Sequence, residues 1–325
     1  MPRRELRLGV VWSLTSHFPT FACYLNELTD ECLKSFSKFT DHPERLEGAR
    51  IAYAWSEDRE ELERIAEAHR IEVVDDVSDM VGRVDGALVL TRYPDKNLEY
   101  ARPFLEAGVP TFIDKPLAPD VETAYEIVRL SREHGTPIMS TSALRYAAEL
   151  DELRSFVRGR ELWGGSVVAP GDFRVENTLY GIHVVEALSS LIGRGVDRVR
   201  GREVEGPRGT HVLVEIVYKS GVAFSVHMGS PCYKWVITLA CEGASTTVVI
   251  ENSYEFYRRT ISRILEMFRT GAEPVDVRDT LEVVRTCYAV QRSIEEGREV
   301  VLDEEFPIPE DLRGLRPIGQ RWGQG

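Results

Sequence analysis

The chain has 325 residues, of which 43% are hydrophobic and 29% are charged, and its formal net charge is -13 at pH 7. This length exceeds that of one ordinary domain, so we expect two domains. The acidic balance argues against nucleic acid and anionic membrane surfaces as partners, because both would repel the protein, and it favours small molecules.

The start of the chain and its cysteines indicate a cellular compartment. The apolar run after the basic start MPRRELRLGVVW is interrupted by Ser13 and Thr15, which fits neither a signal peptide nor a transmembrane span. An odd number of cysteines without a C-x-x-C pair suits a reducing compartment and predicts no metal site. Each cysteine is expected to be a small buried hydrophobe: Cys23, Cys32, Cys232, Cys241 and Cys287. We therefore expect a cytoplasmic protein.

The first half of the chain alternates short apolar runs with segments whose apolar residues recur at helical spacing. Strands are expected at residues 6–12, 49–55, 85–91, 110–114 and 136–143, and helices at 18–36, 58–70, 97–108 and 120–135. Such alternation with short loops predicts a doubly wound parallel sheet of an α/β protein. Residues 1–145 are therefore assigned to an N-terminal Rossmann dinucleotide-binding domain.

The pattern changes after residue 145. Alternating runs at 211–229 and 235–252 follow each other through glycine-containing turns, which is typical of antiparallel strands. Helices are expected around 179–193, 254–271 and 276–297. Residues 146–325 are therefore assigned to a C-terminal α+β domain with an open, mainly antiparallel sheet that binds substrate. Both faces of that sheet require cover, which predicts a homodimer or homotetramer.

One lysine stands where an α/β sheet meets its ligands. In VPTFIDKPLAPD, Lys115 follows a predicted strand directly, and the carboxyl ends of parallel strands are where ligands bind. Together with GIHVVEALSSLIG (181–193) and DTLEVVRTCYAVQRSIEEGREVVL (279–302), this stretch makes the chain resemble the Gfo/Idh/MocA oxidoreductases. These are relatives of glucose-fructose oxidoreductase and inositol dehydrogenase, and the resemblance covers nearly the whole chain.

The resemblance implies two catalytic residues. IDKPLA is similar to the family's E-K-P motif with Asp114 in place of glutamate, which implies that Lys115 stands beside the nicotinamide and the reacting carbinol. His183 matches the histidine that accepts the hydroxyl proton, and imidazole suits that role because it titrates near neutrality. The structural alternatives are a solvated loop lysine and a histidine whose polar atoms are satisfied in the core.

Residues near His183 are implied to contact the substrate. Many family members carry an aspartate four residues before this histidine, but here that position is Leu179. Asp172 or Glu176 are alternatives for the missing carboxylate. The expected substrate-binding residues are Arg145, Tyr180 and Glu186, with an inter-domain ion pair as the alternative for Arg145 and a solvated helix position for Glu186.

The cofactor implied by the resemblance is NAD or NADP. The first strand of the family runs into a G-x-G-x-x-G loop, whereas here only Gly9 is present, and hydroxyl donors stand in that place. Ser56 with Arg59 after the second strand would tolerate NADP, whereas Glu57 or Asp58 would favour NAD. The expected cofactor-binding residues are Ser13, Thr15, Ser16, His17, Ser56, Arg59, Thr91, Arg92, Tyr93 and Asp114.

The leading hypothesis is an NAD(P)-dependent oxidoreductase that acts on a carbinol of a sugar, polyol or related small molecule. A first alternative is a lyase or glycosidase that oxidises its substrate transiently with a retained NAD. A second is a non-catalytic, sugar-binding pseudo-oxidoreductase, which the missing glycines and Leu179 favour.

Overall fold

The computed structural model describes residues 4–13, 15–173, 180–206, 209–229 and 233–319. The chain divides into two compact units. The first contains the residues up to Thr141, Tyr257–Val277 and the segment from Leu315, and the second contains Ser142–Phe256 and Arg278–Gly314. The boundary at Thr141 lies close to the predicted one at residue 145, but two later segments return to the first unit.

The first unit is built on a six-stranded parallel sheet in the order β3-β2-β1-β4-β5-β6. This is the Rossmann strand order, in which the order reverses between β1 and β4. The strands are short, apolar and mostly buried, as parallel strands covered on both faces must be. Their bounds are β1 (Leu6–Ser13), β2 (Ala49–Ser56), β3 (Glu72–Val73), β4 (Gly86–Thr91), β5 (Thr111–Ile113) and β6 (Ile138–Met139).

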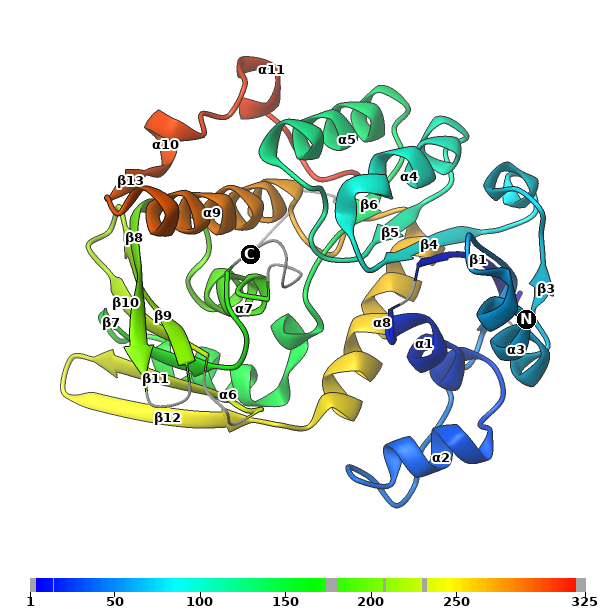
Figure 1. Cartoon of the computed structure of the whole chain (residues 1–325), viewed down its shortest axis with the longest axis horizontal. Helices are drawn as coiled ribbons and strands as arrows, with labels where there is room; N and C mark the ends of the chain where they lie inside the picture. The colour runs from blue at the N-terminus through cyan, green and yellow to red at the C-terminus, as the bar shows by residue number, and fades with distance from the viewer. Residues whose placement is uncertain (1–3, 14, 174–179, 207–208, 230–232, 320–325) are drawn as a thin grey trace. The chain divides into compact units, whose positions relative to one another are not determined.

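Helices cover both faces of this sheet: α4 and α5 lie on one side, and α1 and α3 lie on the other (Figure 1). The single helix expected over 18–36 is wrong, because the chain breaks it into two. The Asn26 side chain turns away to bond the backbones of Ile51 and His69, and Thr29 then caps the second helix. The bounds are α1 (His17–Leu25), α2 (Asp30–Phe36), α3 (Arg59–His69), α4 (Asn97–Glu106) and α5 (Val121–Glu133).

Two later segments complete the first unit. Helix α8 (Ser253–Thr270) enters it at Tyr257, and its Phe268 ring lies so close to Gly86 that a Cβ there would come within 2.5 Å of the ring. After this helix the buried Glu273 carboxylate pairs with Arg132 through two 2.8 Å bonds. The same carboxylate accepts from the backbone of Ile138 at 3.1 Å and of Ile318 at 3.0 Å. Glu273 therefore joins three distant segments of the first unit.

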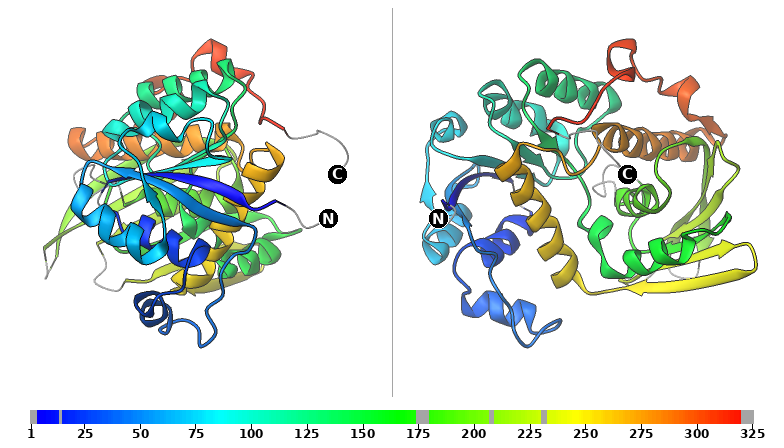
Figure 2. Two further views of the ribbon diagram at one scale, coloured as in Figure 1. Left: turned by 90° about the vertical axis from the view of Figure 1, so that its right-hand side faces the viewer. Right: turned by 180° about the vertical axis from the view of Figure 1, so that it is seen from behind.

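The second unit is built on a seven-stranded sheet in the order β12-β11-β7-β10-β9-β8-β13. The predicted antiparallel character is confirmed, although β7 and β10 pair in parallel. Figure 2 shows β11 and β12 as a long hairpin. The bounds are β7 (Leu162–Ala169), β8 (Val196–Gly206), β9 (Gly209–Tyr218), β10 (Ala223–Met228), β11 (Trp235–Cys241), β12 (Ala244–Ile250) and β13 (Val300–Val301).

Helix α9 packs along β8 of this sheet. The Ser293 hydroxyl accepts from the Gly201 backbone at 2.8 Å, and a Cβ at Gly201 would lie 2.6 Å from Ile294, so this position needs glycine. The expected strand over 136–143 is shorter, since Ser142 caps the 3-10 turn η3 (Ala143–Tyr146). The remaining helices are α6 (Ala148–Val157), α7 (Ile182–Ile192), α9 (Val277–Glu296), α10 (Leu302–Glu305) and α11 (Glu310–Arg313).

The expectation that every cysteine is unpaired is wrong for two of them. Cys23 of α1 and Cys32 of α2 form a disulfide, because the break between these helices folds one back against the other. Cys241 and Cys287 are free and buried, as expected, and Cys232 lies outside the described residues.

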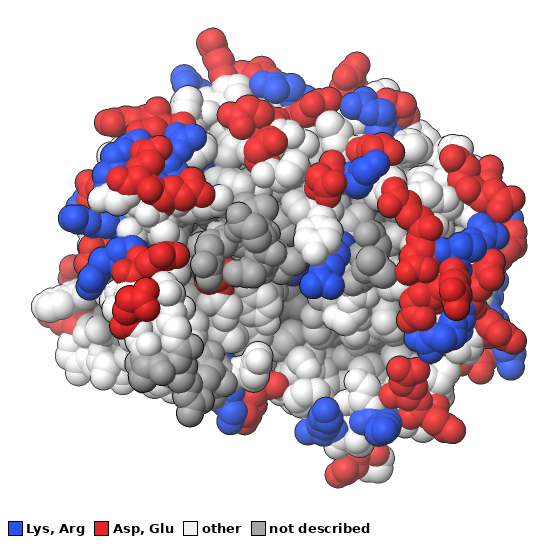
Figure 3. Space-filling view, in the orientation of Figure 1, with Lys and Arg blue, Asp and Glu red and all other residues white. Residues whose placement is uncertain are grey.

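The surface is mixed in charge. On the face shown in Figure 3, acidic side chains outnumber basic ones, and the two kinds lie side by side. Within the described part of the chain, no helix combines the length and the apolar character that a membrane crossing requires.

Candidate active site

Lys115 lies two residues after the end of β5, where the sequence predicts a ligand-binding position. Its side chain is half-buried, and the residues on both sides, Asp114 and Pro116, are buried. The Asp114 carboxylate accepts a 2.8 Å hydrogen bond from the Lys115 backbone N–H through Oδ1. The lysine is therefore mounted on a fixed turn at the carboxyl end of the parallel sheet.

His17 links this turn to two other elements of the first unit. Its Nδ1 bonds the second oxygen of Asp114, Oδ2, and its Nε2 lies 2.8 Å from the Tyr257 hydroxyl on α8. Burial raises the pKa of Asp114, but the charge and hydrogen bond of His17, together with Lys115, outweigh it and hold that pKa below its usual range. Asp114 is therefore an ionised anchor that positions both His17 and the Lys115 peptide.

The loop after β4 is tied to the same turn. The Thr91 hydroxyl bonds the Asn97 side chain, whose amide nitrogen donates to the carbonyls of Pro116 at 3.0 Å and Leu117 at 3.1 Å. All of these polar atoms are buried, so they hold the two loops together. The predicted Arg92 and Tyr93 are exposed, and the guanidinium of Arg92 lies 5.6 Å from the centroid of the Tyr93 ring.

The junction between β1 and α1 is where the pyrophosphate of a dinucleotide binds in a Rossmann fold. Ser16 is the N-cap residue of α1 and is exposed, and its side chain does not bond the helix. The Thr15 hydroxyl accepts from the His17 N–H at 3.0 Å, and Pro19 has no N–H. Of the backbone N–H groups that could bind a pyrophosphate at this helix start, that of His17 is thus already bonded and Pro19 has none. Of Ser13 only the backbone is described, where it pairs with Thr91.

A carboxylate stands at the end of β2, where a Rossmann fold recognises the adenosine ribose. Glu57 is exposed, and its Oε1 accepts a 2.6 Å hydrogen bond from the Tyr100 hydroxyl of α4. Burial and the neighbouring Glu57 raise the pKa of Tyr100 far above its usual range, so this hydroxyl stays a donor. An ordered carboxylate at this point fits a free ribose diol.

The predicted pair Ser56 and Arg59 is occupied elsewhere. Ser56 is buried, and its hydroxyl accepts from the Asp58 backbone at 3.1 Å. Arg59 donates to Glu63 at 2.8 Å and to Asp75 at 3.2 Å. Arg59 is therefore paired with carboxylates of its own surroundings, which does not favour a contact with a 2′-phosphate. The first unit fits NAD better than NADP. Overall the residues present fit a dinucleotide, with hydroxyls in place of loop glycines.

The second unit carries His183 in the first turn of α7. Its ring is half-buried, and Nδ1 lies 2.6 Å from the Ser142 hydroxyl. Ser142 is fully buried and also accepts from the Leu144 backbone at 3.1 Å, which fixes its position. A serine before the 3-10 turn thus orients the imidazole through one ring nitrogen.

Aromatic side chains surround this imidazole. The Tyr180 ring lies edge-on to His183 with centroids 4.5 Å apart, and Trp235 of β11 lies 6.0 Å away. Tyr180 and Trp235 stack on each other at 6.3 Å. Within the described residues, the Trp235 indole nitrogen is buried and has no hydrogen-bond partner. Flat apolar rings and a spare donor beside a histidine suit a ring-shaped ligand with hydroxyl groups.

Arg145 and Glu186 bind each other. Arg145 Nη1 donates to Glu186 Oε2 at 2.8 Å, and both side chains are buried. Arg145 also reaches Asp279 at 3.4 Å. Burial lowers the pKa of Arg145, but Glu186 and the other neighbouring acids reverse this and leave it raised. Arg145 thus forms an ion pair within the second unit, whereas the alternative expected from the sequence was one between domains. The buried Glu186 is not the solvated helix residue of the other alternative.

The sequence reasoning missed several members of these clusters. Tyr257, Ser142 and Trp235 each contact a predicted residue across a long chain separation, and no local signal identifies them. Tyr100 is missed for the same reason, although Glu57 was considered. Asp172 is buried, and its carbonyl accepts from the Gly181 N–H at 2.7 Å. Leu179 and Glu176 lie outside the described residues.

A family model and a curated relative each match a part of this chain. Residues 34–142 match the family model described as "Oxidoreductase family, NAD-binding Rossmann fold". Inositol 2-dehydrogenase 1 of Mycolicibacterium vanbaalenii is 26% identical over 213 residues, which cover 56% of this chain and 62% of that protein. The chain therefore spans less than two thirds of this curated relative.

Solved structures share the fold over almost the whole chain. Scyllo-inositol dehydrogenase from Lactobacillus casei with bound NAD(H) and scyllo-inositol has a TM-score of 0.77 at 12% identity, covering 92% of this chain and 99% of that one. Myo-inositol 2-dehydrogenase from Lactobacillus plantarum has a TM-score of 0.75 at 14% identity, covering 92% and 100%. At these identities the likeness shows the fold.

The fold of the first unit and the matched region are both similar to the NAD-binding Rossmann domain of an oxidoreductase family. Residues 34–142 are therefore similar to the Gfo/Idh/MocA oxidoreductases. The family match begins at residue 34, after β1 and α1, so it leaves out the segment in which the glycine-rich loop is replaced.

Proposed function

We propose that this protein oxidises a carbinol of a polyol or sugar, with NAD as the hydride acceptor. The observation that carries the proposal is the placement of Lys115 on the turn after β5, held by the ionised Asp114, in a region that matches the model of an oxidoreductase family. A curated relative is named inositol 2-dehydrogenase, which supports a cyclic polyol as the substrate class.

The first unit would hold the cofactor through three groups. Glu57 would accept from the adenosine ribose, and the hydroxyls of Thr15 and Ser16 with the start of α1 would meet the pyrophosphate. Lys115 would lie at the nicotinamide end, beside the β5 turn. When bound, NAD supplies the acceptor for the hydride of the carbinol carbon.

The chain's own residues would manage the proton of the substrate hydroxyl. His183 would accept this proton, and the Ser142 contact at Nδ1 supports Nε2 as the accepting atom. The Lys115 ammonium would donate a hydrogen bond to the same oxygen and stabilise the negative charge that develops there. Tyr180 and Trp235 would pack against the carbon skeleton of the substrate and exclude water.

The exposed face of the second sheet supports a homo-oligomer. A row of side chains crosses four paired strands on this face: Val249, Val236, Val168 and His227. Val168 is 36% exposed and Val249 is 45% exposed. We propose that a second copy of the chain covers this row. Light scattering should give at least a dimer for the wild type and a smaller species for Val168→Glu.

Steady-state kinetics with NAD and a panel of cyclic polyols tests the proposal. Lys115→Ala and His183→Ala should each lower turnover by about 10²-fold or more, since general acid–base groups contribute about 10²–10⁴. The exposed residues Lys38 and His134 provide matched controls, and Lys38→Ala and His134→Ala should retain full turnover. Unchanged turnover in Lys115→Ala and His183→Ala would contradict the assignment of both residues.

A further inference from the structure

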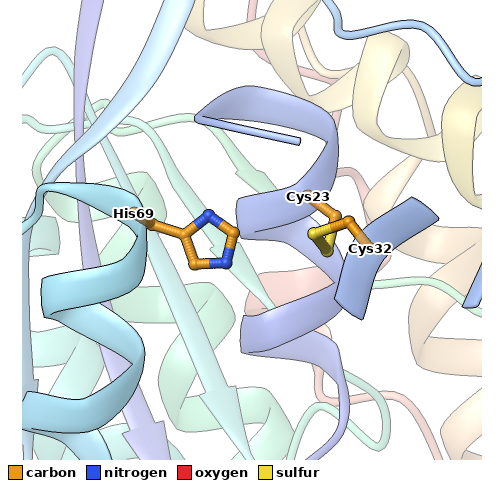
Figure 4. A group of neighbouring side chains, drawn as sticks. All are labelled: Cys23, Cys32 and His69. Carbon is orange, nitrogen blue, oxygen red and sulfur yellow. A yellow bond between two sulfur atoms is a disulfide. The ribbon is translucent and has the colours of Figure 1, made fainter. Parts of the chain in front are cut away.

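Three helices of the first unit bring two cysteines and a histidine together. Cys23 lies on α1, Cys32 on α2, and His69 is the last residue of α3 (Figure 4). All three side chains are buried, and their sulfur and nitrogen atoms lie within 4.8 Å of one another. The two sulfurs are joined in the disulfide, and the imidazole faces them. The cluster thus has two chemical states, set by the oxidation of the sulfurs.

The His69 ring presents a lone pair without a partner. Its Nδ1 is buried and has no hydrogen-bond partner among the residues that the structure describes, and the whole residue is only 5% exposed. The ring also bonds the backbone of Glu27, so Nε2 is the nitrogen that donates. A buried acceptor without a donor destabilises the fold unless something binds it.

This arrangement has the features of a metal-binding histidine. Histidine ligands commonly donate their second ring nitrogen to a carbonyl, which fixes the tautomer and aims the other nitrogen at the metal. The His69 bond to Glu27 meets that description. Thiolate sulfur with imidazole nitrogen is a donor set that zinc prefers, whereas calcium and magnesium require oxygen ligands.

The cluster borders a cavity that has room for an ion. The cavity measures about 140 Å³ and is lined by all three residues, with Thr29 and Glu31. The Thr29 hydroxyl donates to Cys32 Sγ at 3.2 Å, which would stabilise a thiolate there. Glu31 or a water molecule in this cavity would complete a four-coordinate site.

We propose that Cys23, Cys32 and His69 bind a zinc ion when the disulfide is reduced, and that the disulfide is the metal-free form. A dithiol reductant would break the S–S bond by exchange, leaving two protein thiols and its own disulfide, a transfer of two electrons and two protons. Zinc would then displace the two thiol protons and bind the two thiolates with His69 Nδ1. Cys23 and Cys32 are nine positions apart, which matches no common zinc-binding motif. For this reason the sequence alone predicted no metal site.

Zinc titration of the full chain in its two oxidation states tests this proposal. The protein is reduced with a phosphine, which takes up an oxygen atom from water as the disulfide becomes two thiols, and is then freed of reductant and metal without air. Competition with a chromophoric chelator should give one zinc ion per reduced chain, with about two protons released. Cobalt in place of zinc should produce thiolate charge-transfer absorption. The oxidised protein should bind zinc at least about 100-fold more weakly, because its sulfurs carry no thiolate.

Variants assign the ligands. His69→Gln should weaken zinc binding at least about tenfold, and Cys23→Ser and Cys32→Ser should each lower the cobalt charge-transfer band by about half or more, because one of the two thiolates is lost. His134→Gln, at an exposed histidine of the same unit, is the matched control and should bind like the wild type. Circular dichroism checks that each variant is folded. Should the cysteine variants not fold, the oxidised and reduced wild type and His69→Gln decide the question alone.

Two results would overturn the proposal. One is a folded, reduced wild type that binds no stoichiometric zinc. The other is zinc affinity in His69→Gln equal to that of the wild type, which would remove His69 from the site. Neither result bears on the proposed dehydrogenase activity, because the polyol assay is run on the untreated protein.

Discussion

Asp114 Oδ2 bonds His17 Nδ1, joining the turn after β5 to the first residue of α1 across 97 positions of the chain. Substituting Asp114→Asn removes the charge and should destabilise the protein by about 1.5–3 kcal/mol near pH 7, the range for hydrogen bonds to charged groups. The pKa of Asp114 is lowered in the folded state, so its contribution is complete above the unfolded value of about 3.9 and is lost as the pH falls through the lower folded value. Urea unfolding at a series of pH values should therefore show the gap between wild type and variant closing in acid.

The exposed Asp95 supplies the control, because Asp95→Asn should leave the unfolding free energy within about 0.5 kcal/mol of wild type. A gap between Asp114→Asn and the wild type that stays constant at all pH values would show that Asp114 is not an ionised anchor.

Glu57 should decide the preference for NAD over NADP. Its carboxylate is held by Tyr100 at the end of β2, where it would bond a ribose diol and repel a 2′-phosphate. Glu57→Ser should lower the ratio of kcat/KM for NAD to that for NADP by about tenfold, or about 1.4 kcal/mol. Glu60→Ser, at an exposed position in the next helix, should leave the ratio unchanged. An unaltered ratio in Glu57→Ser would place the ribose elsewhere.

Ser142 is a positioning residue, because it contacts the His183 imidazole and acts through it. Ser142→Ala should lower kcat by about tenfold, displace the acidic limb of the pH–rate profile and leave the KM for NAD unchanged. Ser142→Thr retains a hydroxyl and should restore much of the lost rate. A loss of stability without any change in the pH–rate profile would indicate a structural role instead.

Glu273 should be a major source of stability in the first unit. Its side chain is fully buried against Arg132, and removing one partner of such a pair costs about 3–5 kcal/mol because the other charge is left unpaired. Chemical unfolding of Glu273→Gln should show a loss of this size. Glu126→Gln breaks the exposed pair with Arg102 and should cost no more than about 1 kcal/mol. Equal losses in the two variants would contradict the account.

The sequence predicted those parts of the fold that depend on local pattern. The alternation of apolar strands and amphipathic helices identified the parallel sheet, and the change of period near residue 145 identified the antiparallel one. Periodicity reports which face of an element is buried, but it does not report which other element covers that face. For this reason the return of Tyr257–Val277 to the first unit was not predicted.

The candidate site shows the same limit. Lys115 and His183 were identified because each lies in a recognisable stretch, whereas their partners come from elsewhere in the chain. Ser142 reaches His183 across 41 positions, and Tyr257 reaches His17 across 240. The ion pair of Arg145 with Glu186 also depends on tertiary packing, so the sequence alone did not identify Glu186 as its partner.

The central claim is that the first unit binds NAD although its β1–α1 loop has no glycine. Isothermal titration calorimetry of the full chain with NADH and with NADPH tests it most directly, since it requires no knowledge of the substrate. We expect one NADH to bind per chain, at least about tenfold more tightly than NADPH, which is a difference of about 1.4 kcal/mol in binding free energy. Folded protein that binds neither dinucleotide would contradict it.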